Sequence, residues 1–263
     1  MRTIPKTVAC ASLGAALAGS LFLYRTLELG RGDAQPVVLE NLNPAGELLG
    51  PEGIQSDAQG NLYVGDTQSR VWRLEGGRAV PYVDLSQVQA TANVEGSIHA
   101  GGLAFDARGT LYVAAYGFAE GSVLQVEAGT RQVRFFARGI GVANSLVVTQ
   151  DSKYLWVSDF HARGRVLRFP VDSSLPASPD VVVSGLEYPN GLALGKDERA
   201  LFAAETYAGT VARLDLASHA PEVTRVVNLK GSFALGSLDG LAFDPRDQSR
   251  RFLYVAENIR GLF

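Results

Sequence analysis

The chain has 263 residues, enough for one domain with a sizeable core. Its formal net charge is -3 and its isoelectric point is near 5.7, so composition gives no basis for binding nucleic acid. A small-molecule or protein partner is expected instead. The single cysteine, Cys10, excludes a disulfide framework.

The N-terminal segment carries an almost uninterrupted apolar run, residues 7–24, after Arg2 and Lys6. The length of this run suits a membrane-spanning helix. Ala16-Leu17-Ala18 also offers a small-x-small cleavage site, as in a secretory signal peptide. We therefore expect residues 1–35 to be a signal peptide or a membrane anchor with a short linker. The protein should be exported, and so be periplasmic, extracellular or membrane-anchored.

The rest of the chain, residues 36–263, repeats itself. Five copies of one pattern are visible, and the equivalent positions Glu52, Gly101, Asn144, Asn190 and Asp239 are 49, 43, 46 and 49 residues apart. Each copy combines short apolar or alternating segments with polar turns, such as 57–60, which is typical of four short antiparallel strands. This length and content indicate the blades of an all-β β-propeller rather than a β-sandwich.

The first strand of each blade lines the central channel of a propeller, so the residues that begin these strands should converge. The five blades carry Glu52, Gly101, Asn144, Asn190 and Asp239 at this position. Two carboxylates and two amides offer hard oxygen ligands, which suit Ca²⁺. Zn²⁺, Mn²⁺ or Mg²⁺ are alternatives, although a zinc cage more often contains His or Cys. A second interpretation is that Asn, Asp and Gly simply follow turns, as they often do.

From about Leu49 onward, the sequence resembles the family of senescence marker protein, gluconolactonase and luciferin-regenerating enzyme. The motifs that carry the resemblance are Pro51-Glu52-Gly53, Ala143-Asn144-Ser145, Pro189-Asn190-Gly191 and Leu238-Asp239-Gly240. The resemblance implies a six-bladed, calcium-dependent propeller whose metal ligands come from blades one, three, four and five. Ser145 departs from the Asp or Gly that many members have, and this departure leaves a supporting contact of Asn144 open.

The resemblance also implies an activity: hydrolysis of a lactone or a related ester, with Ca²⁺ polarising the carbonyl and activating water. Asp239 is the first choice for general base. His99 is a second catalytic candidate and a possible substrate contact, or else a hydrogen-bonded histidine of its loop. Tyr116, Phe118 and Phe160 are candidate substrate-binding residues.

A further acidic set, Asp66, Asp159, Glu205 and Glu257, follows the second strands. These residues should lie on the same face as the proposed metal site. We expect them to bind turn backbone or to pair with Arg70, Arg163 or Arg260 rather than to line the substrate site. Asp57 and Asp106 are expected to serve turns alone.

Two alternative functions remain open. One is a non-catalytic exported propeller that binds a partner, and the other is a propeller like strictosidine synthase, with an N-terminal anchor. Neither needs the full set of Glu52, Asn144, Asn190 and Asp239.

The repeat length has a further implication for the C-terminal end. A blade that begins at Asp239 should run past Phe263, and a sixth should follow, so we expect the end of blade five and blade six to be lacking. A lone strand is expected at 35–42, where a six-bladed ring would use it to complete its last blade. The alternative is a five-bladed ring that this strand closes.

Overall fold

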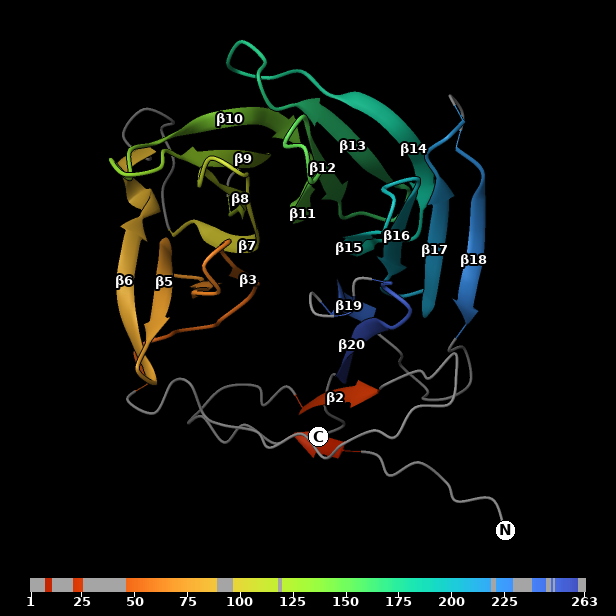
Figure 1. Ribbon diagram of the computed structural model, residues 1–263, viewed down its shortest axis with the longest axis horizontal. Coiled ribbons are helices and arrows are strands. Elements are labelled where there is room, and N and C mark those ends of the chain that lie inside the picture. Colours follow the sequence, from red (N-terminus) through yellow and green to blue (C-terminus); the bar gives the residue numbers. More distant parts are fainter. Residues whose placement is uncertain are drawn as a thin grey trace.

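Antiparallel sheets arranged around a common axis form the molecule (Figure 1). The computed structural model describes residues 8–10, 21–25, 46–88, 97–117, 120–218, 221–228, 238–244, 247 and 249–259. The predicted strand at 35–42 lies outside these residues.

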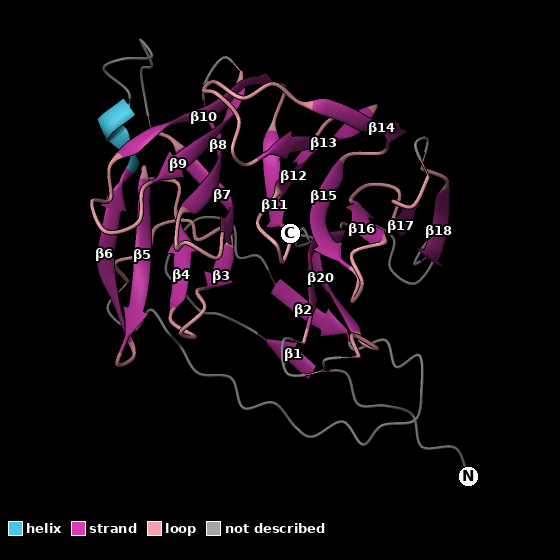
Figure 2. Ribbon diagram, turned by 45° about the horizontal axis from the view of Figure 1, so that its top comes forward, coloured by secondary structure: helices cyan, strands magenta, loops and turns pink. Residues whose placement is uncertain are grey.

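Four sheets are complete four-stranded blades, and each runs from the axis outward in chain order. Blade 1 contains β3 (Ile54–Ser56), β4 (Leu62–Gly65), β5 (Arg70–Glu75) and β6 (Arg78–Asp84), followed by a short 3-10 helix, η1 (Leu85–Val88). Blade 2 contains β7 (His99–Phe105), β8 (Leu111–Tyr116), β9 (Gly121–Val126) and β10 (Val133–Ile140). Figure 2 shows η1 beside β6.

Blades 3 and 4 repeat the same arrangement. Blade 3 contains β11 (Ala143–Val148), β12 (Tyr154–Asp159), β13 (Gly164–Pro170) and β14 (Asp180–Leu186). Blade 4 contains β15 (Pro189–Leu194), β16 (Ala200–Glu205), β17 (Thr210–Asp215) and β18 (Val223–Asn228). The all-β propeller of four-stranded blades is therefore confirmed.

The fifth sheet is assembled from both ends of the chain. Its inner strands are β19 (Leu238–Phe243) and β20 (Leu253–Ile259), and its outer strands are β2 (Leu21–Arg25) and β1 (Val8–Cys10). β2 pairs antiparallel with β20, and β1 pairs with β2. The described residues thus form five sheets, one fewer than the six-bladed propeller that the resemblance implies. The apolar run, residues 7–24, thus contributes backbone to the sheet, and its predicted role in export or anchoring stays a prediction. Among the described residues, no helix has the length and apolar character needed to cross a membrane.

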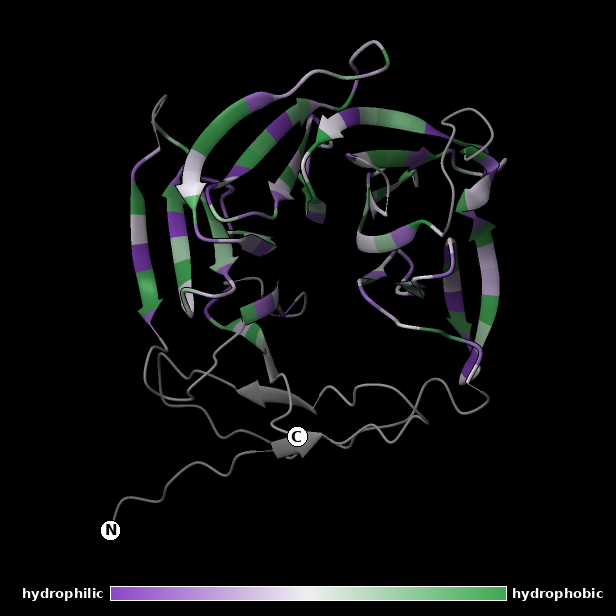
Figure 3. Cartoon of the chain, turned by 180° about the vertical axis from the view of Figure 1, so that it is seen from behind, coloured by the Kyte–Doolittle hydropathy of each residue, from purple (hydrophilic) through white to green (hydrophobic). Residues whose placement is uncertain are grey.

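The core consists of apolar layers between successive blades. Residues of blades 2 and 3, for example, enclose Phe136 and Phe169, which are fully buried. Figure 3 shows hydrophobic and hydrophilic residues alternating along several outer strands, as expected where only one face of a strand meets a neighbouring blade. Burial of a side chain of this size contributes about 1.5–3 kcal/mol.

Aspartates close the turns between first and second strands, as the sequence indicated. Asp57 Oδ1 accepts hydrogen bonds from the backbone N–H groups of Gln59 and Asn61, both at 2.9 Å. Asp106 Oδ1 repeats the pattern in blade 2 with Arg108 and Thr110. We call this end of the blades the turn face, and the opposite end, where the innermost strands begin, the axial face.

Candidate metal and substrate site

A β-bulge marks the start of the innermost strand in blades 2 to 5. The register shifts between Ala100 and Leu103 in blade 2, and the same shift recurs at 143–146, 189–192 and 238–241. Asn144, Asn190 and Asp239 each lie within such a bulge. A bulge inserts an extra residue and redirects side chains, and bulges are common beside functional sites. The repeated bulge therefore places these three residues in equivalent positions on the axial face.

Close backbone contacts join these positions from blade to blade. A Cβ at Gly53 would collide with the carbonyl oxygen of Gly101, and a Cβ at Gly191 would collide with that of Asp239. A Cβ at Gly102 would lie 2.8 Å from the carbonyl oxygen of Asn144. Glycine is therefore required at all three positions, because the innermost strand of the next blade passes too close to leave room for a Cβ.

Ser145 makes the connection between blades 3 and 4 by hydrogen bonding. Its hydroxyl oxygen accepts a hydrogen bond from the backbone N–H of Leu192 at 3.2 Å, and its own N–H donates to Ser158 Oγ at 2.9 Å. The departure from the family pattern at this position thus supplies a polar link between neighbouring blades. It supports the strand that carries Asn144 from the blade 4 side.

Glu52, Asn190 and Asp239 come together on the axial face. The side-chain amide of Asn190 donates a hydrogen bond to the Asp239 carboxylate, which lowers the pKa of Asp239, but burial outweighs this and leaves that pKa raised. Burial is also the main cause of the raised pKa of Glu52, and the negative charge of Asp239 raises it further. The two carboxylates therefore lie close enough to repel each other.

Tyr116 supports Glu52 from blade 2. Its hydroxyl donates a hydrogen bond to the Glu52 carboxylate, which opposes the rise in the pKa of Glu52. Burial, followed by the charge and hydrogen bond of Glu52, raises the pKa of Tyr116 well above its ordinary value, so this residue is a donor at neutral pH. His99 is the register partner of Tyr116, and their ring centroids are 5.0 Å apart.

The described residues fit a hard divalent cation. Two carboxylates and an amide converge, burial disfavours the charged form of both acids, and a cation between them would offset their repulsion. Asn144 is half-buried and joins the ring through its backbone, and the membership of its side chain in the set stays a prediction. Within the described part of the chain, no three His, Cys, Asp or Glu side chains converge, so amide oxygens are needed to complete a site.

The acids that close the second strands are structural. Asp66 is fully buried and accepts hydrogen bonds from the N–H groups of Gln68 and Arg70 and from the indole N–H of Trp72. The expected backbone bonding is confirmed, but the arginine partners differ from those predicted.

Two of the acids pair with arginines of the third and fourth strands of their own blades. Asp159 is bound by Arg165, on the adjacent third strand, and not by Arg163. Glu205 is bound by Arg225, on the fourth strand. Arg260 and the side chain of Glu257 lie outside the described residues. Asp66, Asp159 and Glu205 are already bonded within their blades, so they serve the fold rather than the candidate site.

Phe160, the residue after blade 3's second strand, belongs to an aromatic group whose other members were not predicted from the sequence. Its ring centroid lies 5.2 Å from that of Tyr188 and 6.3 Å from that of Tyr207. Tyr188 precedes Asn190 by two residues, as His99 precedes Gly101. That shared offset was the one available signal for Tyr188, whereas Tyr207 lies in a turn with no distinctive pattern. Phe118 lies outside the described residues.

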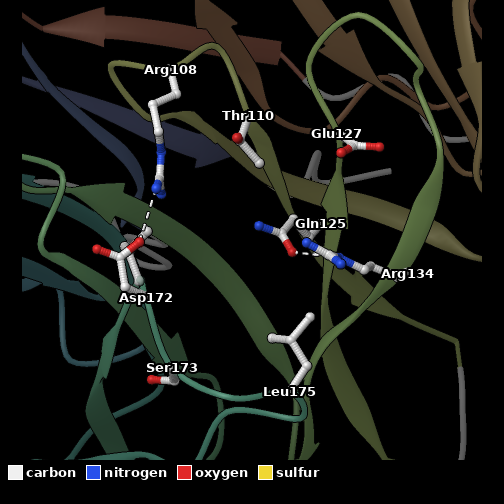
Figure 4. A pocket seen from close by; sticks show the side chains of 9 residues that line it. Arg108, Thr110, Gln125, Glu127, Arg134, Asp172, Ser173 and Leu175 are labelled. Atoms are coloured by element: carbon white, nitrogen blue, oxygen red, sulfur yellow. Dashed lines mark hydrogen bonds and ion pairs between the residues drawn. The ribbon is translucent and has the colours of Figure 1, made fainter.

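A cleft of about 370 Å³ lies elsewhere, at the turn face between blades 2 and 3. Figure 4 shows Arg108 directed to Asp172 and Gln125 to Arg134 across it, with Leu175 nearby. Its arginines are paired with acceptors of the protein itself. Since the cleft is at the opposite ends of the strands from Glu52 and Asp239, it is separate from the candidate site.

Comparison with known proteins bears on the fold of the chain. A family model described as "Strictosidine synthase-like, N-terminal" matches residues 41–74. No curated protein matches the chain by sequence at a significant level.

Solved structures resemble the fold over most of the chain. A gluconolactonase from Xanthomonas campestris is 16% identical with a TM-score of 0.57, covering 98% of this chain and 99% of that one. A luciferin-regenerating enzyme is 17% identical with a TM-score of 0.58, covering 81% and 78%. A chain of a nidogen–laminin complex is 13% identical with a TM-score of 0.58, covering 91% and 82%. The fold is that of the gluconolactonase and luciferin-regenerating enzyme propellers, and the same fold also occurs in a protein–protein complex.

Proposed function

We propose that the protein is a calcium-dependent hydrolase of lactones or related esters. The observation that carries this proposal is the convergence of Glu52 and Asp239, with Asn190 bonded to Asp239, at the axial ends of blades that share the gluconolactonase fold. Glu52, Asn144, Asn190 and Asp239 would hold the ion. When bound, Ca²⁺ would supply the positive charge that polarises the substrate carbonyl and stabilises the oxyanion.

The protein's own side chains have distinct tasks in this mechanism. The Asn190 amide fixes the orientation of the Asp239 carboxylate, which a general base requires before it can take a proton from water. Tyr116 holds Glu52 by a hydrogen bond and thereby fixes the opposite side of the site. His99, half-buried and packed against Tyr116, would position that ring and contact substrate.

The test is a panel of lactones, aryl esters and organophosphates, assayed with and without a chelator. We expect hydrolysis of at least one lactone or ester, its loss on chelation, and its return when Ca²⁺ is added. Hydrolysis that is unaffected by the chelator would contradict the metal dependence. Activity restored better by Zn²⁺, Mn²⁺ or Mg²⁺ would change the identity of the metal but retain the site.

The family-model match at residues 41–74 favours a second candidate, a propeller like strictosidine synthase that need not retain the full metal-ligand set. Against it, we weigh the axial acids, which this alternative does not need. Absence of any hydrolysis, together with absence of cation binding, would favour the alternative.

Export or membrane association through residues 7–24 forms part of the proposal. Its support is the charged start and apolar run of that segment. Fractionation of cells that express the full chain, with N-terminal sequencing of the product, would show whether the segment is cleaved or retained.

A further inference from the structure

Three aromatic residues from blades 3 and 4 form a cluster on the axial face: Phe160, Tyr188 and Tyr207. Phe160 directly follows Asp159, whose register partner is Ala143, next to Asn144. Tyr188 directly precedes Pro189, whose register partner is Glu205, two residues before Tyr207. All three are therefore close in the chain or in register to the proposed ligands Asn144 and Asn190.

The rings pack on one another but remain partly open to solvent. The Tyr188 and Tyr207 centroids are 4.6 Å apart with an interplanar angle of 80°, and Phe160 lies 5.2 Å from Tyr188. Tyr207 is 50% exposed, and Phe160 and Tyr188 are half-buried. Apolar surface left exposed beside a polar site is typical of a ligand-binding groove.

Backbone hydrogen bonds hold the cluster in a fixed relation to the metal site. The Tyr188 N–H donates to the carbonyl oxygen of His161 at 3.0 Å, and its own carbonyl accepts from the Thr206 N–H at 3.1 Å. The Thr206 hydroxyl donates in turn to the carbonyl oxygen of Leu238, the residue before Asp239, at 2.7 Å. The cluster is thus tied to the strand that carries the proposed base.

Tyr188 has a backbone conformation that a bulky residue rarely adopts. Its φ is 52°, in the left-handed region. A glycine or asparagine would adopt this conformation at lower cost. The presence of a tyrosine here therefore indicates that its ring has a role. Residues held in such conformations often cluster at ligand sites.

The three aromatic side chains favour some substrate groups over others. Aromatic rings bind flat apolar groups through their faces and edges. A polyhydroxylated lactone needs a hydrogen-bonding partner for each hydroxyl, and an unmatched buried partner is strongly disfavoured. The cluster offers three rings and only two hydroxyls.

We propose that Phe160, Tyr188 and Tyr207 form a subsite for an aryl or alkyl group on the lactone or ester, which makes such substrates preferred over sugar lactones. This inference rests on the proposed hydrolase function for its substrate class. The three residues bind and position the substrate and take no part in proton transfer.

The test compares a γ-butyrolactone that carries a phenyl group with the unsubstituted lactone and with a sugar lactone. Wild type should show the highest kcat/KM for the phenyl-bearing lactone, through a lower KM. In Tyr207→Ala, the ratio of kcat/KM for the phenyl-bearing lactone over the parent should fall about tenfold. Tyr207→Phe should keep the ratio within about twofold because the ring is retained.

Tyr254→Ala is the matched control, since Tyr254 is also an exposed tyrosine, at 40%, but belongs to β20 outside the cluster. Its ratio should stay at the wild-type value. The subsite would be overturned if the kcat/KM ratio did not change in Tyr207→Ala, or if it fell equally in Tyr254→Ala. A wild-type preference for the sugar lactone would also overturn it.

Calorimetry with a phenyl-substituted tetrahydrofuran, which cannot be hydrolysed, separates this inference from the proposed function. With chelator present, the probe should bind wild type and Tyr207→Phe but bind Tyr207→Ala more weakly. This result would support the subsite even if no lactone were hydrolysed. Hydrolysis without any binding of this probe, and without a phenyl preference, would overturn the subsite and leave the hydrolase intact.

Discussion

The side-chain amide of Asn190 donates a hydrogen bond to the carboxylate of Asp239 across the boundary between blades 4 and 5. An amide carries both a donor NH₂ and an acceptor oxygen, whereas an ionised carboxylate only accepts. Asparagine can therefore hold Asp239 in place and still offer an oxygen to a cation. A carboxylate at 190 would add repulsion instead. This explains why the equivalent positions are not all acidic.

Replacing Asp239 by Asn should reduce turnover far more than stability. The variant keeps an oxygen ligand but removes the proposed base and one negative charge. We expect kcat to fall at least a hundredfold, with a melting temperature close to that of wild type in chelator. Steady-state kinetics and a thermal melt measure both effects.

Asn190→Ala is the companion variant. It removes a ligand and the hydrogen bond that orients Asp239 but leaves the carboxylate, so its activity should recover as Ca²⁺ concentration is raised. Wild-type turnover in Asp239→Asn would assign the base to another residue, and His99 would be examined next.

Gly191→Ala should destabilise the fold by about 3 kcal/mol, because its Cβ would collide with the backbone of the neighbouring blade at Asp239. Gly240→Ala is the matched control in blade 5. There the nearest atom to an added Cβ is 3.8 Å away, and the free energy of unfolding should change by less than about 1 kcal/mol. Denaturant unfolding of both variants measures the difference, and equal effects would show that the close approach is unimportant.

The Glu205–Arg225 pair should make stability depend on acid pH. Burial opposes the ionisation of Glu205, but hydrogen bonds from Arg225, Thr210 and the backbone of Glu187 outweigh it and lower its pKa below the ordinary 4.5. A lowered pKa in the folded state gives stability that is present above the unfolded pKa and is lost as pH falls through the folded one.

Glu205→Gln should therefore lower the free energy of unfolding by about 2 kcal/mol at pH 7. The gap from wild type should narrow as pH falls below 4.5. Glu222→Gln, which changes an exposed glutamate of the same blade, should have little effect at any pH. A gap that stays constant down to pH 3 would mean that the pair contributes through packing alone.

The repeat in the sequence was sufficient to predict the four-stranded blades, and it assigned Glu52, Asn190 and Asp239 to equivalent positions in them. Equivalent positions in equivalent blades must lie at the same height, so spacing alone locates them. The choice of Arg165 and Arg225 as partners could not be predicted in this way. Arg165 is the register partner of Asp159 on the third strand, so its choice depends on the exact register of the second and third strands. Arg225 lies on the fourth strand, where a bulge after Val211 shifts the pairing by a residue.

Two further features, the contact between two tyrosines and the pairing of β2 with β20, could not be predicted from the sequence for physical reasons. Tyr188 and Tyr207 come together only because two strand ends meet on the axial face, and a tyrosine beside a turn carries no periodic signal. The pairing of Leu21–Arg25 with β20 was also not predicted, because a continuous apolar run does not distinguish a buried strand from a helix.

Calorimetric titration of Ca²⁺ into protein stripped by a chelator tests the central claim most directly. We expect one binding site per chain, a rise in melting temperature on binding, and a marked loss of affinity in both Glu52→Gln and Asp239→Asn. A ligand bound only by the folded state adds about 2.7 kcal/mol of stability at one hundred times its dissociation constant. A flat titration with an unchanged melt, or full-affinity binding in both variants, would contradict the account.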